Sequence, residues 1–440
     1  MSDTIYALSS GQGRAGVAVV RLSGPAVRDV FQTMCGKVPT ARIATLMTVR
    51  HPIDGITIDK GLCLWFAAPR SFTGEDMGEF QLHGGPAVIL RLLGAFSSVD
   101  GLRPAEPGEF TRRAFVNGKL DLVEVEALGD VISAETEGQL RLAQRLAGGA
   151  LSNRVSCWRK ALVSARSAVE AAIDFSDEGD VRTDVRSEVA PPIRQVLRDI
   201  EAVLDDGGRG ERLRDGLTVA IAGPPNAGKS TLLNLLARRE AAIVSPFAGT
   251  TRDPVEVHLD LGGVPVTLVD TAGLRDGGDE VEAIGVARAR ERVAKSDLVL
   301  WLEPAMDLGE ASAEAPPECL RVTTKLDLAP ESLTPRSLAI SAVTGVGLPE
   351  LTGLLVQRAR ELAGAQENVL IARARQRAAL HGCAEELKAL LKLADGKKGA
   401  ALEFQAEHLR RAMRELGRLI GQVDVEEVLG EIFAAFCIGK

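Results

Sequence analysis

The chain has 440 residues, of which 45% are hydrophobic and 25% charged, and its formal net charge is -8. This composition excludes intrinsic disorder, and at roughly 150 residues per domain it suggests about three domains. No apolar run approaches the roughly 18 residues of a membrane helix, and the first residues lack the pattern of a signal peptide. We therefore expect a cytoplasmic protein without a membrane span. Because the net charge is negative, any RNA contact must be local or shared.

The first part of the chain alternates short apolar stretches with turns. Residues 17–22, 61–66 and 79–83 are predicted strands, and residues 87–93 have a helical pattern. Apolar residues then recur at helical spacing from about 120 to 173. The scattered cysteines form no CxxC pair, and the five histidines show no HxxxH spacing, which argues against a disulfide framework and a zinc site.

A change of pattern near Leu217 predicts a new domain. Strand candidates at 217–222, 264–269, 297–302 and 338–340 alternate with helical segments, and the chain is helical again after residue 366. We interpret this order as a helical domain interrupted by an α/β insert. The predicted domains are an N-terminal α+β domain (1–119), an insert (214–362) and a discontinuous all-α domain (120–213 and 363–440).

A phosphate-binding loop is the clearest motif. Gly223-Pro-Pro-Asn-Ala-Gly-Lys-Ser230 follows an apolar strand and precedes a helical segment, as a P-loop requires. Its backbone amides surround phosphates, Lys229 reaches the β and γ oxygens, and the Ser230 hydroxyl is a ligand for Mg²⁺. The nucleotide-binding residues predicted in this segment are Gly223, Asn226, Ala227, Gly228, Lys229, Ser230 and Thr231.

Two further motifs follow in the order of a nucleotide switch. Asp270-Thr-Ala-Gly273 comes after the next apolar strand, where a carboxylate lies near Mg²⁺ and a glycine amide near the γ-phosphate. Gly249-Thr-Thr-Arg-Asp253 precedes it, and a threonine hydroxyl there, assigned to Thr251, completes the Mg²⁺ shell while the γ-phosphate is present. The nucleotide-binding residues predicted here are Ser245, Gly249, Thr250, Thr251, Asp270, Thr271, Ala272 and Gly273.

Base selection is predicted at Thr324-Lys-Leu-Asp327. The Asp327 carboxylate accepts from guanine N1–H and the 2-amino group, which adenine lacks, and the Lys325 stem lies over the base. Ser341 and Ala342 support the base through a main-chain amide. The usual motif begins with asparagine, so Thr324 leaves open how part of the guanine contact or of the loop bracing is made.

Together these motifs resemble the MnmE (TrmE) family of tRNA-modification GTPases, as do segments 71–76, 83–85, 107–110, 117–121 and 437–440. The resemblance implies an N-terminal folate-binding domain that homodimerises and a Ras-like GTPase domain inserted into a helical domain. It implies tRNA as substrate and a FAD-dependent partner, MnmG, in a heterotetramer. The product is an aminomethyl or carboxymethylaminomethyl group on C5 of the wobble uridine, built with a tetrahydrofolate one-carbon unit.

The resemblance also implies roles for single residues. Leu274 stands where Ras-like enzymes have a water-positioning glutamine, and the residues alone leave Asp276, Asp279, Glu280 and Glu282 open as replacements. The family pattern selects Glu282 as the catalytic residue and implies that K⁺ replaces an arginine finger. Cys437, three residues from the end, is a candidate for a chemical role if a neighbouring cation lowers the pKa of its thiol, and otherwise packs the tail against the N-terminal domain. The implied K⁺ ligands are Asn226, Ser245, Phe247 and Thr250, and the implied folate-binding residues are Arg21, Glu79, Lys119 and Lys440.

Two other readings of the motifs compete with this one. A regulatory GTPase switch of the ribosome-assembly type would share the G-domain motifs but has no evident need for the folate-like segments or the Cys-Ile-Gly-Lys tail. An ATP-dependent P-loop enzyme is disfavoured by Asp327, because adenine offers no matching pair of donors.

Overall fold

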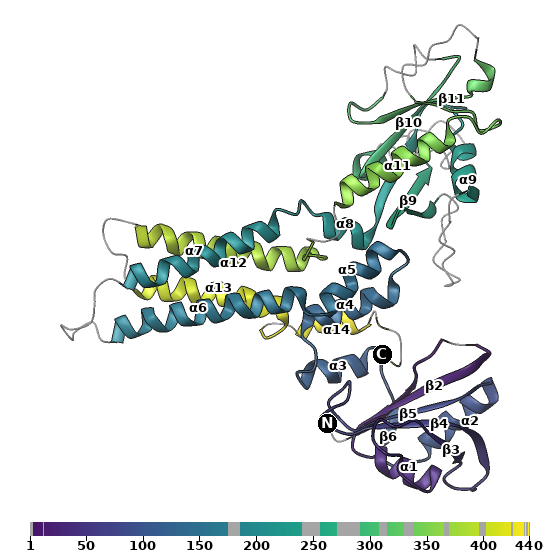
Figure 1. Cartoon of the computed structure of the whole chain (residues 1–440), viewed down its shortest axis with the longest axis vertical. Coiled ribbons are helices and arrows are strands. Elements are labelled where there is room, and N and C mark those ends of the chain that lie inside the picture. The colour runs from purple at the N-terminus through teal and green to yellow at the C-terminus, as the bar shows by residue number, and fades with distance from the viewer. Residues whose placement is uncertain are drawn as a thin grey trace, which may run out of the picture. The chain divides into compact units, whose positions relative to one another are not determined.

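The computed structural model divides into two compact units, Met1–Gly129 with Gly417–Lys440 (the N-terminal unit) and Asp130–Leu416 (the central unit). Figure 1 labels most helices and strands of both. The residues described by the structure are 3–11, 13–174, 185–239, 256–270, 291–307, 315–329, 338–364, 369–395, 402–423, 426–434, 436 and 439.

The N-terminal unit contains a six-stranded sheet of order β3-β4-β5-β2-β1-β6, antiparallel except for the parallel pair β1 and β6. Its strands are β1 (Thr4–Leu8), β2 (Ala15–Ser23), β3 (Thr45–Arg50), β4 (Thr57–Phe66), β5 (Met77–Gly84) and β6 (Leu102–Pro104). Its helices are α1 (Val27–Cys35), α2 (Pro86–Ser97), α3 (Glu109–Val116) and α14 (Glu426–Ala434), and α4 (Leu122–Ser133) runs from this unit into the central one.

An aromatic cluster shows how this sheet is covered. The ring of Phe80 on β5 lies 4.9 Å from Phe31 of α1 and 5.4 Å from Phe96 of α2, and all three side chains are fully buried. Both helices therefore pack on the same face of the sheet, where aromatic rings contribute the largest buried areas. The predicted α+β organisation of this part of the chain is confirmed.

The central unit contains a helical bundle made from two distant segments. Helix α7 packs against α6, which precedes it, and against α12, which follows the α/β body (Figure 1). The fold is therefore a helical domain interrupted in sequence, as predicted. The helices of this unit are α5 (Glu137–Ala147), α6 (Ala150–Asp174), α7 (Val185–Leu204), α8 (Arg209–Asp215), α9 (Lys229–Arg239), α11 (Leu348–Ala363), α12 (Ala374–Asp395) and α13 (Leu402–Ile420).

The α/β body is a second six-stranded sheet, of order β12-β11-β10-β7-β9-β8. Only the edge strand β8 is antiparallel to its neighbour within the described residues. Four of its strands coincide with the predicted ones, and β8 and β11 are additional. The strands are β7 (Leu217–Ala222), β8 (Glu256–Leu261), β9 (Val264–Asp270), β10 (Leu298–Pro304), β11 (Leu320–Thr324) and β12 (Leu338–Ala339).

This topology determines where the site motifs meet. The P-loop follows β7, Asp270 ends β9, Thr324 ends β11 and Ser341 follows β12. Because these strands are parallel, all four positions lie at the carboxyl edge of one sheet, where open α/β sheets bind ligands. Among the helices that the structure describes, none combines enough length with enough apolarity to cross a membrane.

Candidate functional site

The P-loop adopts a backbone that its sequence explains. Gly223 has φ +142°, and a Cβ on it would lie 2.4 Å from the carbonyl oxygen of Leu302 on β10. Only glycine fits this position, because an L side chain would meet both the strained dihedral and the neighbouring strand. Asn226 adopts φ 61° with an exposed side chain, a conformation that asparagine tolerates better than most residues. The loop thus leaves β7 sharply and presents its amides at the start of α9.

The side chain of Lys229 is folded into this loop. Its Nζ donates hydrogen bonds to the carbonyl oxygens of Gly223 (2.9 Å) and Pro224 (2.8 Å), and the residue is 8% exposed. The ammonium group is therefore held within the loop, beside the place where phosphate oxygens bind. A phosphate there forms charge-assisted hydrogen bonds with this group, which are stronger than bonds to neutral carbonyls.

Ser230 and Asp270 form the second part of the phosphate site. The Ser230 hydroxyl lies 2.6 Å from the Asp270 carboxylate, and the register of the parallel strands β7 and β9 pairs Ile221 with Asp270. One hydroxyl and one carboxylate oxygen are the hard ligands that Mg²⁺ prefers, together with phosphate oxygens and water. The two side chains therefore fit a magnesium ion beside the P-loop lysine.

The base-recognition motif lies next to the P-loop. Asp327 is exposed, on the short 3₁₀ turn η2 (Leu326–Leu328), and its Oδ1 accepts a hydrogen bond from the buried Ser341 hydroxyl at 2.6 Å. The preceding Lys325 has φ 56°. Ser341 thus orients the carboxylate and leaves the second oxygen of Asp327 without a donor among the described residues. The structure brings Asp327, Lys325, Ser341 and Ala342 together, as the sequence predicts.

A bracing bond that the sequence left open joins these two parts. The Thr324 hydroxyl donates to the carbonyl oxygen of Ala227 in the P-loop at 2.8 Å, and both residues are buried. The loop bracing is therefore made by threonine. The motif marked Thr324 as unusual, but only the structure shows which of its possible contacts it makes.

Several predicted nucleotide and ion residues fall outside the described part of the chain. They include the catalytic candidate Glu282 and the proposed second Mg²⁺ ligand Thr251. The full set is Ser245, Phe247, Gly249, Thr250, Thr251, Thr271, Ala272, Gly273, Glu282, Cys437 and Lys440.

In the N-terminal unit, two predicted folate-binding residues are neighbours. Arg21 on β2 and Glu79 on β5 are register partners, and Arg21 Nε lies 2.8 Å from Glu79 Oε1. Lys119 is exposed, and its Cε lies 3.2 Å from where a Cβ on Gly74 would stand. The carboxylate of Glu79 is therefore oriented by Arg21, whereas Lys119 lies beside Gly74.

Gly439, near the end of the chain, lies against the same sheet. Ser9 Oγ donates to the carbonyl oxygen of Gly439 at 2.9 Å, and a Cβ on Gly439, with φ +96°, would lie 2.3 Å from the Leu8 carbonyl oxygen. The strand register pairs Ala7, adjacent to Leu8, with Arg21. Gly439 therefore lies at the end of β1, the neighbour of the strand that carries Arg21.

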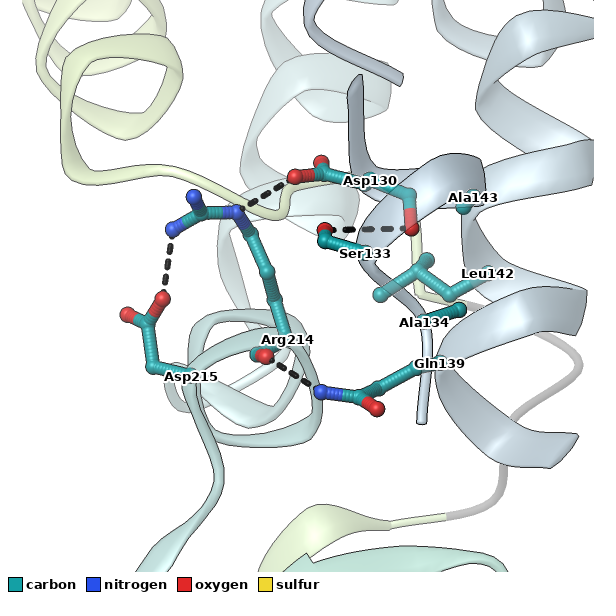
Figure 2. Close-up of a pocket in the computed structure, with 8 residues that line it drawn as sticks. All are labelled: Asp130, Ser133, Ala134, Gln139, Leu142, Ala143, Arg214 and Asp215. Atoms are coloured by element: carbon teal, nitrogen blue, oxygen red, sulfur yellow. Dashed lines mark hydrogen bonds and ion pairs between the residues drawn. The ribbon is translucent and has the colours of Figure 1, made fainter. Parts of the chain in front are cut away.

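A cavity in the central unit is a feature that the motifs did not indicate. It has a volume of about 70 Å³ and lies where α4, α5 and α8 meet. Asp130 Oδ1 is 3.0 Å from Arg214 and 2.7 Å from Arg373, while Gln139 donates to the Arg214 carbonyl at 2.8 Å. Figure 2 shows the Arg214 side chain between Asp130 and Asp215. Arg214 precedes the α/β body in sequence and Arg373 follows it, so we call these three ion-paired residues, Asp130, Arg214 and Arg373, the junction cluster.

A strand–loop–helix phosphate cradle, an adjacent hydroxyl–carboxylate pair and an oriented base-reading aspartate define a P-loop GTPase. Two family models match the chain: the MnmE helical domain over residues 122–437 and the GTP-binding protein TrmE N-terminus over residues 4–119. The chain therefore belongs to the MnmE family of tRNA modification GTPases.

Full-length relatives agree with this family. A "tRNA modification GTPase MnmE" from Bradyrhizobium sp. (strain ORS 278) is 51% identical over 100% of this chain and 99% of its own length. The protein of the same name from Beijerinckia indica is 51% identical over 100% of this chain and 96% of its own length. Among solved structures, the FeoB G-domain from Methanococcus jannaschii aligns with 33% of this chain and 98% of its own, with 21% identity and a TM-score of 0.24, too low to support an argument.

Proposed function

We propose that this chain is a K⁺-stimulated GTPase that modifies C5 of the wobble uridine in certain tRNAs. It acts with a FAD-dependent partner, MnmG in the resembling family, and adds an aminomethyl or carboxymethylaminomethyl group from a tetrahydrofolate one-carbon unit. The observation that carries the proposal is the assembled Ser230, Asp270 and Asp327 site inside a chain that belongs to the MnmE family over its whole length. We place this activity in the cytoplasm.

The proposed GTPase mechanism assigns a task to each group of residues. Lys229 neutralises charge on the phosphates, and Ser230 and Thr251 hold Mg²⁺, which supplies further positive charge when bound. Asn226, with main-chain oxygens of Ser245, Phe247 and Thr250, is proposed to hold K⁺ at the developing negative charge. Glu282 is proposed to orient the attacking water. The exposed side chain of Asn226 in the P-loop supports its part of this assignment.

The proposed folate site lies on the N-terminal sheet. The Glu79 carboxylate suits the paired N–H donors of a pterin, whereas Arg21, Lys119 and Lys440 suit the carboxylates of the glutamate tail. The contact between Gly439 and Ser9 supports the inclusion of Lys440, because it brings the residue before Lys440 to the end of β1, the neighbour of the strand that carries Arg21. We assign Cys437 a candidate chemical role in the same tail.

The proposal includes a domain arrangement and an assembly. Residues 1–119 form the folate-binding and dimerisation domain, 120–213 and 363–440 the helical domain, and 214–362 the G domain. Two chains form a homodimer and combine with the FAD-dependent partner in a heterotetramer. The separate family matches to 4–119 and 122–437 support a division near residue 120.

The direct test is restoration of modified tRNA in bacteria that lack their own gene of this family. The chain and its Lys229→Ala variant are expressed at equal levels, and wobble nucleosides are quantified by mass spectrometry. We expect the chain to restore the modified uridine and the variant to restore less than a tenth of it. Absence of restoration by the unaltered, folded chain would contradict the proposed function. Full restoration by Lys229→Ala would contradict the need for GTP hydrolysis.

A further inference from the structure

The hydrogen bonds of Thr324, at the end of strand β11, determine which atoms of a purine this site can recognise. Thr324 is 5% exposed, and its single hydroxyl proton is donated to the Ala227 carbonyl oxygen at 2.8 Å. The Thr324 carbonyl oxygen accepts from the Ala305 amide at 2.9 Å. The hydroxyl therefore has no second proton with which to contact a base acceptor.

The donors that remain near Asp327 are few. The Ser341 amide donates to the Val346 carbonyl oxygen at 3.0 Å, and the Ser341 hydroxyl donates to Asp327. The Ala342 amide donates to nothing within the described ranges. The Ala342 amide is thus a main-chain donor available beside the carboxylate that is expected to read the base.

Guanine presents two donors and two acceptors to such a site. N1–H and the 2-amino group suit a carboxylate, O6 is the acceptor adjacent to N1, and N7 is a further acceptor on the side of O6 away from N1. The Asp327 carboxylate meets the two donors, and the Ala342 amide is matched to O6. No donor from Thr324 is left for N7.

We propose that this chain reads guanine through its N1, N2 and O6 edge alone and leaves N7 unread. Thr324 is then a positioning residue, which fixes the P-loop against β11, and it is not a base contact. The inference rests on the GTP-binding site described above and concerns only how that site selects its nucleotide.

An asparagine at this position would behave differently. Its amide carries two N–H donors and one acceptor. One N–H can therefore donate to the Ala227 carbonyl while the second N–H reaches the base. Thr324→Asn is therefore a gain-of-contact variant. Thr324→Val removes the hydroxyl at nearly constant shape, and Thr324→Ser retains it as the matched control.

The first experiment uses the unaltered chain and compares the affinities of GDP, 7-deaza-GDP and IDP by isothermal titration calorimetry. We expect 7-deaza-GDP, which lacks N7, to bind within twofold of GDP. IDP, which lacks the 2-amino group, should bind at least tenfold more weakly, because Asp327 loses a donor. A preference of more than fivefold for GDP over 7-deaza-GDP would overturn the inference. Absence of GDP binding would instead contradict the nucleotide site itself.

The second experiment tests the role of Thr324 with the same nucleotides. Thr324→Val should weaken GDP and 7-deaza-GDP equally, by about fivefold or more, with Thr324→Ser within twofold of the unaltered chain. Thr324→Asn should raise the preference for GDP over 7-deaza-GDP to about fivefold. Unchanged affinity in Thr324→Val would contradict the role of the Thr324 hydroxyl in fixing the P-loop. A change of more than threefold in the ratio of its affinities for GDP and IDP would show that Thr324 contacts the base.

Discussion

At the residue scale, the Ser230 hydroxyl is the atom whose removal tests the metal site most simply. It lies 2.6 Å from Asp270, and Ser230 is exposed, so its loss does not open a cavity. We expect Ser230→Ala to lower kcat for Mg²⁺-dependent GTP hydrolysis roughly 100-fold, since a metal ligand supplies several kcal/mol of transition-state stabilisation. Ser230→Thr, which keeps the hydroxyl, should retain most of the activity. Equal turnover by the two variants would contradict the assignment.

Glu282 is the second single residue, and its task is a proposed one. As a water-positioning carboxylate it should contribute roughly 100-fold or more to kcat and little to nucleotide affinity. We expect Glu282→Ala to lose that factor in single-turnover GTP hydrolysis while GDP binds within twofold. Asp279→Ala, in the same segment, is the matched control and should keep its turnover. Loss of activity in the control with retention in Glu282→Ala would assign the water to another group.

The base-recognition residues differ in how far the sequence predicts their contacts. The base-recognition motif alone predicts Asp327, Lys325, Ser341 and Ala342 as one group. The structure brings them together, with the Ser341 hydroxyl bonded to Asp327. The partner of Thr324 was not predictable, because Ala227 lies 97 positions away in sequence and contributes only a backbone carbonyl. Main-chain acceptors carry no signature of residue type.

At the element scale, the start of helix α3 depends on a buried ion-pair network. Glu109, whose side chain is 0% exposed, lies 2.6 Å from Arg103 and 3.1 Å from Arg113 and accepts from the Glu106 amide at 2.9 Å. Burial by itself raises the pKa of Glu109, but the hydrogen bonds from Arg103, the Glu106 amide and Arg113 outweigh it and hold the pKa below its ordinary value.

The lowered pKa of Glu109 predicts that the stability of the N-terminal unit decreases in acid. A carboxylate with a lowered folded-state pKa stabilises the fold fully above its unfolded pKa of about 4.3, and this stabilisation is lost as pH falls through the folded-state value. We expect Glu109→Gln to lower the free energy of unfolding of the N-terminal unit by about 3 kcal/mol at pH 7 and to flatten its decline in acid. Urea unfolding followed by Trp65 fluorescence, with Trp158 and Trp301 replaced by Phe, measures this. The exposed Glu106→Gln is the control, and an equal effect there would contradict the account.

The junction cluster leads to a second prediction, which concerns the two segments that connect to the α/β body. Asp130, with its side chain 14% exposed, pairs with Arg214 before the α/β body and with Arg373 after it. Asp130→Asn should therefore loosen both connections and increase amide hydrogen exchange in residues 209–216 and 369–373 about tenfold. Asp215→Asn removes another partner of Arg214, but Asp215 is 61% exposed, so its effect should be small. Unchanged exchange in Asp130→Asn would contradict this role for the cluster.

The strands of the α/β body differ in how clearly their apolar sequence patterns predict them. The buried central strands β7, β9 and β10 are continuous apolar runs and were predicted, because parallel strands are covered on both faces. Strand β8 was missed, since it is an edge strand whose sequence Glu-Val-His-Leu-Asp-Leu alternates between exposed and buried positions. Its pairing is decided by the hairpin with β9, which a local apolar pattern does not reveal.

At the scale of the whole molecule, the interrupted helical domain was predictable because helical periodicity surrounds a segment of α/β pattern. The packing of α7 on both α6 and α12 confirms that the two helical segments form one bundle. The junction cluster was not predictable, because Asp130, Arg214 and Arg373 are ordinary charged residues, on or just before helices, until the fold brings them together. Charged residues at such positions are usually solvated.

The proposed K⁺ stimulation of GTP hydrolysis is measured by turnover of the purified chain. GTP hydrolysis is measured in K⁺ and in Na⁺ at matched ionic strength, with ATP as the nucleotide control and Asn226→Ala as the matched variant. The account predicts at least tenfold faster GTP turnover in K⁺ than in Na⁺, little ATP turnover, and loss of the K⁺ effect in Asn226→Ala. Equal turnover in both salts, or a preference for ATP, would contradict it.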